Sequence, residues 1–569
     1  MPFSAVMLFV LSLVAGVATV HAQTADVSPI RLTIRDEVLN PVDSRLFGQF
    51  MERASWGEPG YDAARDADHP RQLRPAVVEK MQWMNIPVIR FPAGADLMRI
   101  DWRDMIDNVP GREGGRPPFR GKRARALSNE FGIDEFLGLC EKLGAEGLLP
   151  VRLHPAVMQD KPGPYAADAA ALVAYCNAPA GADLPEGMTD WPAVRAANGR
   201  EKPWGVKYFQ IGNESWHYFN DALKRNGLAE ASIDEKAELY LRSLRAFLEA
   251  MHAIDPDIQI IVDGVTGAGP WVDRKVLNDP TVRKHASYFS LHLYQPWGIG
   301  EVKRDGERVS VGDLTAKDIW YAWVATPAIS RQTGQSRLPY YPDWCLVRDI
   351  CLPIACTEWN WNGWWSLPED SPKPPLNSHW ARGIGAAGML HAFMRSGDEV
   401  QLACQSLLVG QRWGITAIRV NDEDADGPYF MPTGQVTGLY SRHHGSELLL
   451  AEVANMRSYD QPLRFNSIAP ARRVAMVDVL VTRGRGTAYV HMINRHADQP
   501  MPVQIDVSEL VDAAAAATLH EMTGQLEGRQ TQIDQRRIAP ADGGAGYQLR
   551  LSARSVSILS IPLERQQPR

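Results

Sequence analysis

Two short apolar runs in this sequence end in a carboxylate. The run "KYFQI" at 207–211 is followed by Gly212, Asn213 and Glu214, and "IACT" leads directly to Glu358. A carboxylate at the end of a buried strand is costly unless a partner neutralises it or a site uses it. Two such groups facing one cleft could cleave a glycosidic bond, one as the acid for the leaving oxygen and the other as nucleophile or base. For either group alone, the alternative is a structural ion pair.

Other polar side chains also stand where predicted strands end. They are Glu52, Arg90, His292 and Tyr294. The carboxyl ends of the strands of a barrel face its active site, so these positions are candidates for the same site. The chain also contains 17 tryptophans, whose faces pack well on apolar and sugar-ring surfaces, although most tryptophans in any protein are core residues.

The pattern that would position these residues is an alternation of short apolar runs with helical segments. The predicted strands are 45–52, 86–92, 148–153, 206–212, 258–264, 288–294, 353–359 and 400–409. Helices are predicted at 74–85, 133–144, 165–176 and from Ser232 to about Asp255, where Ser232 and Glu235 form a capping-box signature. Such alternation predicts an α/β fold, a (β/α)8 barrel over 46–445, with a doubly wound open sheet as the main alternative.

The pattern changes after about residue 445. Strand-like segments divided by Gly, Asp and Pro predict an antiparallel β-sandwich over 446–569, with one helix conceivable at "LVDAAAAAT" (510–518). The segment 23–45 contains the strand-like "SPIRLTI" (28–34), which has no barrel partner and is a candidate strand of the sandwich.

Residues 1–22 have the apolar run and small-residue end of a secretory signal peptide. We therefore expect an exported protein, periplasmic or extracellular, that has no membrane contact once the signal is removed. An uncleaved membrane anchor is the alternative.

Composition narrows the classes of partner and cofactor. The 569-residue chain has a formal net charge of −7, which gives no indication of nucleic-acid binding. Its six cysteines include no CxxC and no Cys/His cluster with zinc spacing, so we expect no metal and no cofactor. Cys345 and Cys351 are close enough in sequence to pair in an oxidising compartment, and the other four lie in apolar segments as buried thiols.

Several longer segments resemble one enzyme family. The resemblance is to glycoside hydrolase family 51, chiefly α-L-arabinofuranosidases, within clan A of the retaining barrel glycosidases, and it covers most of 40–445. The segments that carry it are "LFGQFMER" (46–53), "IRFPAGADLMRIDWRDMI" (89–106), "NEFGIDEFLGLCEKLGAE" (129–146), "RAANGREKPWGVKYFQIGNESW" (195–216), "SLHLY" (290–294) and "TEWNW" (357–361).

The resemblance implies a role for each matched residue. Glu214 would be the acid/base and Glu358 the nucleophile of a double displacement that retains configuration. Substrate-binding roles would fall on Glu52, Asn213, His292, Tyr294, Trp102 and Trp359. Tyr294 would hold Glu358 ionised, and burial would raise the pKa of Glu214 toward the working pH, as a general acid requires. The substrate would be a carbohydrate, and association into homo-oligomers stays open.

The chain departs from the family pattern where the sugar should be recognised. Ala95 stands where the family has an asparagine, and Gln405 lies two positions before the expected glutamine, where Leu407 aligns. Release of terminal arabinofuranose by exo action on plant-type polysaccharides or oligosaccharides is the main hypothesis. The alternatives are the same chemistry in an endo-glycanase, a β-xylosidase or a galactofuranosidase, and a non-catalytic carbohydrate-binding protein.

The segment "GIGAAG" (383–388) fits the dinucleotide-binding pattern G-x-G-x-x-G literally. A loop-like stretch precedes it in place of a strand, and no acidic residue follows at the distance that a ribose contact requires. We therefore expect these small residues to let a helix pack closely.

Overall fold

The computed structural model describes residues 28–563 except 56–57, 122–125, 266–269, 326–351, 422–426, 467 and 542–543. The predicted signal segment and the Cys345–Cys351 pairing lie outside the described residues. The other four cysteines are buried free thiols. Within the described ranges, no helix combines the length and the apolar character that crossing a bilayer requires.

Eight parallel strands close into a barrel in the order of the chain, and the last pairs with the first. They are β2 (Gly48–Phe50), β5 (Val88–Arg90), β8 (Glu146–Val151), β9 (Tyr208–Ile211), β10 (Gln259–Val262), β11 (Ala286–Gln295), β15 (Ile354–Trp361) and β17 (Val400–Ser406). Each coincides with a predicted run. The (β/α)8 prediction is confirmed, and the open-sheet alternative is wrong because β17 closes on β2.

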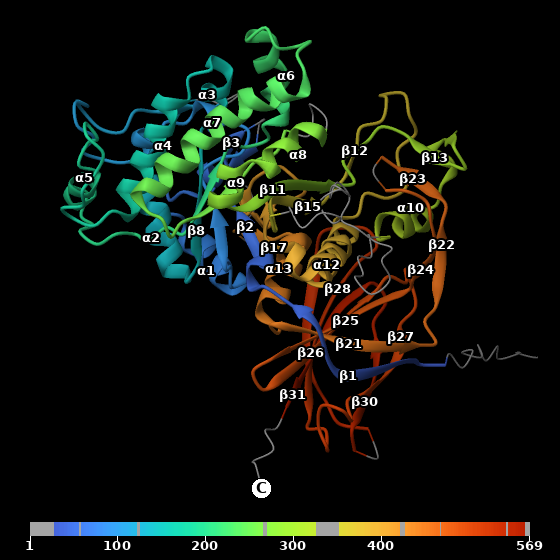
Figure 1. Ribbon diagram of the computed structural model, residues 1–569. Coiled ribbons are helices and arrows are strands. Elements are labelled where there is room, and N and C mark those ends of the chain that lie inside the picture. The colour runs from blue at the N-terminus through green and yellow to red at the C-terminus, as the bar shows by residue number, and fades with distance from the viewer. Residues whose placement is uncertain are drawn as a thin grey trace, which may run out of the picture.

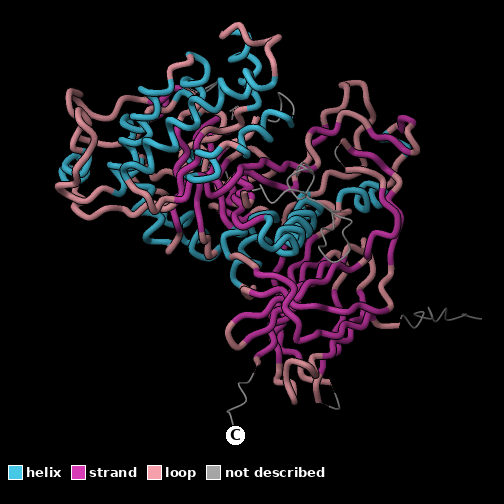
Figure 2. Tube along the Cα trace, in the orientation of Figure 1, coloured by secondary structure: helices cyan, strands magenta, loops and turns pink. Residues whose placement is uncertain are grey.

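Helices surround the barrel and cover its outer face (Figures 1 and 2). The described helices are α1 (Pro75–Met84), α2 (Ile133–Leu143), α3 (His154–Gln159), α4 (Pro162–Asn177), α5 (Trp191–Ala197), α6 (Trp216–Arg225), α7 (Ile233–Ile254), α8 (Pro270–Asn278), α9 (Pro280–His285), α10 (Ala316–Trp323), α12 (His379–Ser396) and α13 (Pro432–Arg442). The capping box forms as predicted, since Ser232 Oγ accepts from the Glu235 amide and the Glu235 carboxylate accepts from the Ser232 amide.

The "GIGAAG" segment lies in the middle of α12 and packs against the barrel. A Cβ on Gly385 would come within 1.7 Å of the Trp361 ring, so only glycine lets the helix approach this closely. The prediction of close helix packing is confirmed.

A nine-stranded sheet forms the second region, which we call the β domain; it lies below the barrel in Figure 1. Its strands, in sheet order, are β29 (Thr531–Ile538), β28 (Ala517–Gly524), β31 (Ser555–Pro562), β26 (Thr487–Asn494), β25 (Val477–Gly484), β21 (Glu447–Ala454), β1 (Ile30–Pro41), β27 (Met501–Asp506) and β30 (Gly546–Leu551). The sheet is mostly antiparallel, as predicted.

Two details of the β domain differ from the sequence-based expectation. Strand β1, which precedes the barrel in the chain, lies between two strands that follow it. It is antiparallel to β21 but parallel to β27. Residues 510–516 form turns and irregular chain in place of the conceivable helix, and Ala517 already pairs with Ile538 in the sheet. Tertiary pairing therefore overrides the helix preference of the alanines.

Short strands complete the described structure. Strand β12 (Gly298–Ile299) pairs with β16 (Trp364–Trp365), and β13 (Val302–Arg304) pairs with β14 (Glu307–Val309) and with β23 (Leu463–Phe465). The remaining ones are β3 (Arg53–Ser55), β4 (Glu58–Gly60), β6 (Phe119–Arg120), β7 (Ala126–Leu127), β18 (Val409–Gly410), β19 (Ile418–Arg419), β20 (Tyr429–Phe430), β22 (Ser458–Gln461) and β24 (Ala471–Ala475).

A buried charge cluster joins α12 to the β domain. Asp478 on β25 accepts hydrogen bonds from Arg395 at 2.5 Å and from Arg495 at 3.0 Å. His391 Nδ1 lies 3.5 Å from the same carboxylate. Burial alone would raise the pKa of Asp478, but the surrounding cations hold it well below its usual range. This cluster is called the interface cluster below.

Candidate active site

Glu214 follows β9 on a backbone turn that points its side chain over the barrel. Gly212 has φ +89° and Glu214 itself φ +47°, a region that side-chain-bearing residues seldom adopt. The Ser215 amide donates to Asp263 at 2.7 Å and fixes the turn to the end of β10. A strained backbone at the end of a barrel strand is typical of a functional position.

Glu358 lies across the barrel, within β15 and three residues before the last residue of that strand, Trp361. One carboxylate oxygen accepts from Arg90 Nη1 at 2.7 Å, and the other accepts from the Tyr294 hydroxyl at 2.8 Å. Tyr294 also lies 2.5 Å from Ser406 Oγ. Both oxygens of the carboxylate are therefore held in fixed positions by strands β5, β11 and β17.

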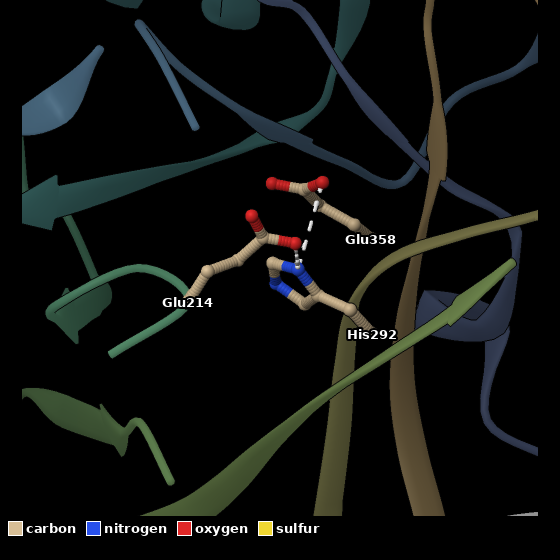
Figure 3. Close-up of side chains that lie close together, drawn as sticks. All are labelled: Glu214, His292 and Glu358. Atoms are coloured by element: carbon tan, nitrogen blue, oxygen red, sulfur yellow. Dashed lines mark hydrogen bonds and ion pairs between the residues drawn. The ribbon is translucent and has the colours of Figure 1, made fainter. Parts of the chain in front are cut away.

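His292 links the two carboxylates (Figure 3). Its Nδ1 lies 2.9 Å from Glu214 and 3.5 Å from Glu358. One oxygen of each carboxylate and this nitrogen all lie within 4.8 Å of one another. The separation is in the short range of glycosidases that form a covalent intermediate, whereas about 6.5 Å or more leaves room for a water between the carboxyl groups. Donor atoms this close could also hold a metal ion.

The ionisation of Glu214 differs from the prediction. Burial favours a raised pKa, but hydrogen bonds from His217 and His292 outweigh it and lower the pKa of Glu214 below its usual range. Conversely, Glu214 raises the pKa of His217, and the nearby carboxylates overcome burial to raise that of His292. These shifts favour an ionised Glu214 carboxylate, with the proton on His217 or His292.

Glu52, two residues beyond β2, is a carboxyl group with a raised pKa. Burial and the charge of Glu358 raise the pKa of Glu52 to about 8. Its oxygen accepts from the Gly94 amide at 3.1 Å. A Cβ on Gly94 would lie 2.6 Å from a Glu358 oxygen and 3.2 Å from a Glu52 oxygen, so the backbone passes between the two carboxyl groups only because residue 94 is glycine.

Arg90 connects the nucleophile candidate to Asn213. The fully buried guanidinium donates to Glu358 and, at 2.5 Å, to the Asn213 amide oxygen. The sequence placed Arg90 at a strand end without giving it a role, and His217 and Ser406 were missed altogether. The signal for Arg90 was the position itself, because an arginine ending a core strand needs a buried anion.

Two predicted residues lie elsewhere. Trp359 is fully buried on the opposite face of β15 and packs edge-on against Phe393 of α12, because successive side chains of a strand point to opposite faces. Trp102 donates to Asp168 at 3.2 Å and packs against Trp191, in the wall of a small cavity beside α4. Its described polar and ring contacts involve none of the carboxylates of the site.

The glutamine that aligns poorly with the family pattern is also outside the site. Gln405 is buried between the barrel and α13, where its amide oxygen accepts from Gln49 at 3.3 Å and its amide nitrogen donates to the Thr433 carbonyl at 3.4 Å. The structure thus brings together Glu52, Asn213, Glu214, His292, Tyr294 and Glu358 at one end of the barrel.

Family models match both regions of the chain. Residues 80–296 match the model described as the α-L-arabinofuranosidase 1 domain, and residues 358–557 match the model described as the α-L-arabinofuranosidase C-terminal domain. The first range contains Glu214 and His292, and the second begins at Glu358.

Whole proteins of the same description are similar over most of their length. Alpha-L-arabinofuranosidase C of Emericella nidulans is 24% identical over 82% of this chain and 84% of that protein. A probable α-L-arabinofuranosidase C of Aspergillus terreus is 28% identical over 85% of this chain and 87% of its own length. The fold is similar to the thermostable GH51 α-L-arabinofuranosidase of Thermotoga petrophila, with a TM-score of 0.66 at 20% identity over 93% of this chain and 99% of the other.

Proposed function

The chain belongs to the α-L-arabinofuranosidases of glycoside hydrolase family 51, and from this premise we propose that it is a retaining, exo-acting enzyme. It would release terminal arabinofuranose from plant-type polysaccharides or oligosaccharides. The observation that carries the retaining mechanism is the approach of the Glu214 and Glu358 carboxylate oxygens within 4.8 Å.

In the first step, Glu358 attacks the anomeric carbon while the bond to the leaving oxygen breaks. Glu214 takes up a proton from His217 or His292 and gives it to that oxygen, so the products are a glycosyl ester of Glu358 and a free alcohol. Arg90 and Tyr294 hold Glu358 in place for the attack. Because the attacking group is already fixed, little reorganisation is needed as the transition state forms.

In the second step, Glu214 takes a proton from a water molecule that attacks the anomeric carbon. The ester bond breaks, Glu358 leaves as a carboxylate, and Glu214 is protonated again. Two inversions at one carbon give net retention. His292 and His217 keep a proton within hydrogen-bonding or ion-pair distance of Glu214 between the steps.

Glu52 and Asn213 would bind hydroxyl groups of the glycone. Asn213 accepts from Arg90, and Glu52 accepts from the Gly94 amide close to Glu358. Glu52 is only 6% exposed, which suits a pocket that encloses one terminal sugar. A glycone held in this position meets Glu358 directly, and the leaving group extends outward.

The test uses 4-nitrophenyl α-L-arabinofuranoside and the full chain. We expect hydrolysis in which the α-anomer of L-arabinofuranose is released first. Proton NMR identifies the released anomer. Glu358→Gln should lower kcat by about four orders of magnitude or more, since an amide cannot form the ester intermediate. Exposed Glu186→Gln is the matched control and should leave kcat unchanged.

Initial release of the β-anomer would contradict the retaining mechanism. A panel of aryl glycosides that includes β-xylopyranoside and galactofuranoside tests the glycone. Faster turnover of either one than of the arabinofuranoside would contradict the proposed substrate.

A further inference from the structure

The turn that carries Glu214 needs support from outside its own segment. Gly212 and Glu214 both have positive φ angles, +89° and +47°, and the second lies in a region that a side-chain-bearing residue seldom adopts. Such a conformation persists only where surrounding contacts compensate for its strain. The group that makes those contacts therefore determines where the Glu214 carboxyl group points.

Asp263 reaches this turn from the neighbouring barrel strand. It directly follows the last residue of β10, which pairs with β9, and it is fully buried. Its Oδ2 accepts a hydrogen bond of 2.7 Å from the amide of Ser215, the residue after Glu214. Because the acceptor is a side chain at the end of another strand, the closed barrel, and not the local sequence alone, holds the turn.

The environment of Asp263 is unusual for a carboxyl group whose only role is to stabilise the fold. Burial raises the pKa of Asp263 to about 6, because His292 and Ser215 offset the effect of burial only in part. Within the described residues, its other oxygen, Oδ1, has no hydrogen-bond partner. Burying a carboxyl group with one oxygen unpaired is costly, and such a cost is typical of positions that a functional site uses.

Both partners of the hydrogen bond between Asp263 and Ser215 are themselves held in place. The Tyr240 hydroxyl on α7 donates to the Asp263 carbonyl at 2.7 Å. On the other side, Ser215 Oγ lies 2.9 Å from the Tyr218 hydroxyl on α6. A Cβ on Gly212 would lie 3.0 Å from Ser215 Oγ and 3.4 Å from the Asp263 Cβ. The strand end and the turn are therefore packed against each other, so a change at Asp263 is transmitted to the turn.

We propose that Asp263 is a positioning residue that directs the Glu214 carboxyl group toward the leaving oxygen. This inference rests on the proposed function, in which Glu214 gives a proton to that oxygen. Without the Asp263 side chain the turn can relax, so proton transfer becomes less efficient. The nucleophile stays in place, because Arg90 and Tyr294 hold it from other strands. The loss of rate should therefore grow with the need of the leaving group for a proton.

The experiment compares two substrates that share the arabinofuranose glycone. The leaving group of 4-nitrophenyl α-L-arabinofuranoside departs with little help from an acid, whereas that of methyl α-L-arabinofuranoside needs a proton. In Asp263→Ala, we expect kcat/KM for the methyl glycoside to fall about tenfold more than kcat/KM for the nitrophenyl glycoside. Asp263→Val, which fills the space but offers no acceptor, should show the same change and replaces Asp263→Ala if that variant does not fold. Asp263→Asn keeps an oxygen that can accept from the Ser215 amide, so it should retain most of the wild-type ratio.

Asp279→Ala is the matched control. Asp279 is also buried, and it accepts hydrogen bonds from the backbone amides of Thr281 and Val282 at the start of α9. This variant should lose stability but keep the wild-type ratio of the two kcat/KM values. An unchanged ratio in Asp263→Ala and Asp263→Val would overturn the inference, and so would equal losses on both substrates, because either result indicates a purely structural role. If the wild-type chain hydrolyses neither substrate, the proposed function itself has failed, which is a distinguishable outcome.

Discussion

The active site and the interface cluster both bury carboxylates, but they balance charge in opposite ways. At the interface, Asp478 alone faces two arginines and a histidine. In the active site, Glu52, Glu214 and Glu358 share Arg90 and the imidazoles of His217 and His292. The interface cluster has more cations than carboxylates, whereas the active site has one fully buried guanidinium among three carboxyl groups.

This difference determines what protons can do in each place. The neighbouring arginines hold the pKa of Asp478 well below its usual range. Asp478 therefore stays ionised near neutral pH. In the active site, burial and the charge of Glu358 raise the pKa of Glu52 to about 8, because Arg90 offsets them only in part. The pKa of Glu214 is lowered by hydrogen bonds from the imidazoles of His217 and His292. A site that must move a proton needs groups poised near the working pH.

Of the changes that test this comparison, removing the one buried guanidinium of the active site should have the largest effect. Arg90→Met leaves Glu358 and Asn213 without their donor, so we expect kcat/KM to fall by about 10³-fold or more and stability to fall with it. Buried Arg195→Met is the matched control, because Arg195 donates to backbone carbonyls of 175 and 178. It should lose stability but keep its activity per folded molecule, and equal kinetic losses in both variants would contradict the comparison.

Breaking the interface cluster should cost stability without changing the chemistry. Asp478→Asn leaves buried Arg495 and half-buried Arg395 beside a neutral group, which should lower the free energy of unfolding by about 3–5 kcal/mol. Urea unfolding measures the loss, and kcat of the folded fraction should be unchanged. Exposed Asp221→Asn should stay within about 0.5 kcal/mol of wild type. A large fall in kcat without loss of stability would contradict the separation of the two regions.

The Glu52→Gln variant should become more stable than the wild-type protein as the pH rises. The folded pKa of Glu52, about 8, lies above its ordinary value of 4.5. Its contribution to stability is therefore complete below pH 4.5 and is lost as pH rises toward 8. A glutamine does not ionise, so the variant should exceed wild type by on the order of 2–4 kcal/mol at pH 9 and by little at pH 4.5. Urea unfolding at both pH values measures this, and a gap that does not widen with pH would count against it.

The smallest effect is expected from His217, whose side chain is 70% exposed. His217→Asn removes a hydrogen bond that lowers the pKa of Glu214, so that pKa should rise and the alkaline limb of kcat/KM should move up by less than about one pH unit. His69→Asn is the control, because His69 pairs with Asp66 at the same sequence spacing on the surface. A limb that moves to lower pH would show that Glu214 is not the group observed.

The barrel was predictable because its strands are short apolar runs with polar ends, and all eight were located from sequence. Contacts between side chains were harder to predict from the sequence. The family resemblance of "TEWNW" implies a substrate-binding role for Trp359, although alternation along a strand places it and Glu358 on opposite faces. The lowered pKa of Glu214 depends on His217, on the next turn of the chain, and on His292, 78 residues away. Only the closed barrel creates the second contact. Arg90 had the right position, but its two partners come from β9 and β15.

The place of β1 in the β domain has a consequence for biosynthesis. This strand is synthesised before the barrel strands, yet its partners β21 and β27 are made more than 400 residues later, with Ile30 opposite Val503. The whole barrel is synthesised in between and can fold before β1 has a neighbour. Until then β1 is an unpaired strand, and such edges attract other chains. The β domain is therefore complete only when β21 and β27, made after the barrel, pair with β1, made before it. In a nascent chain that stalls after the barrel, β1 would have no partner strand.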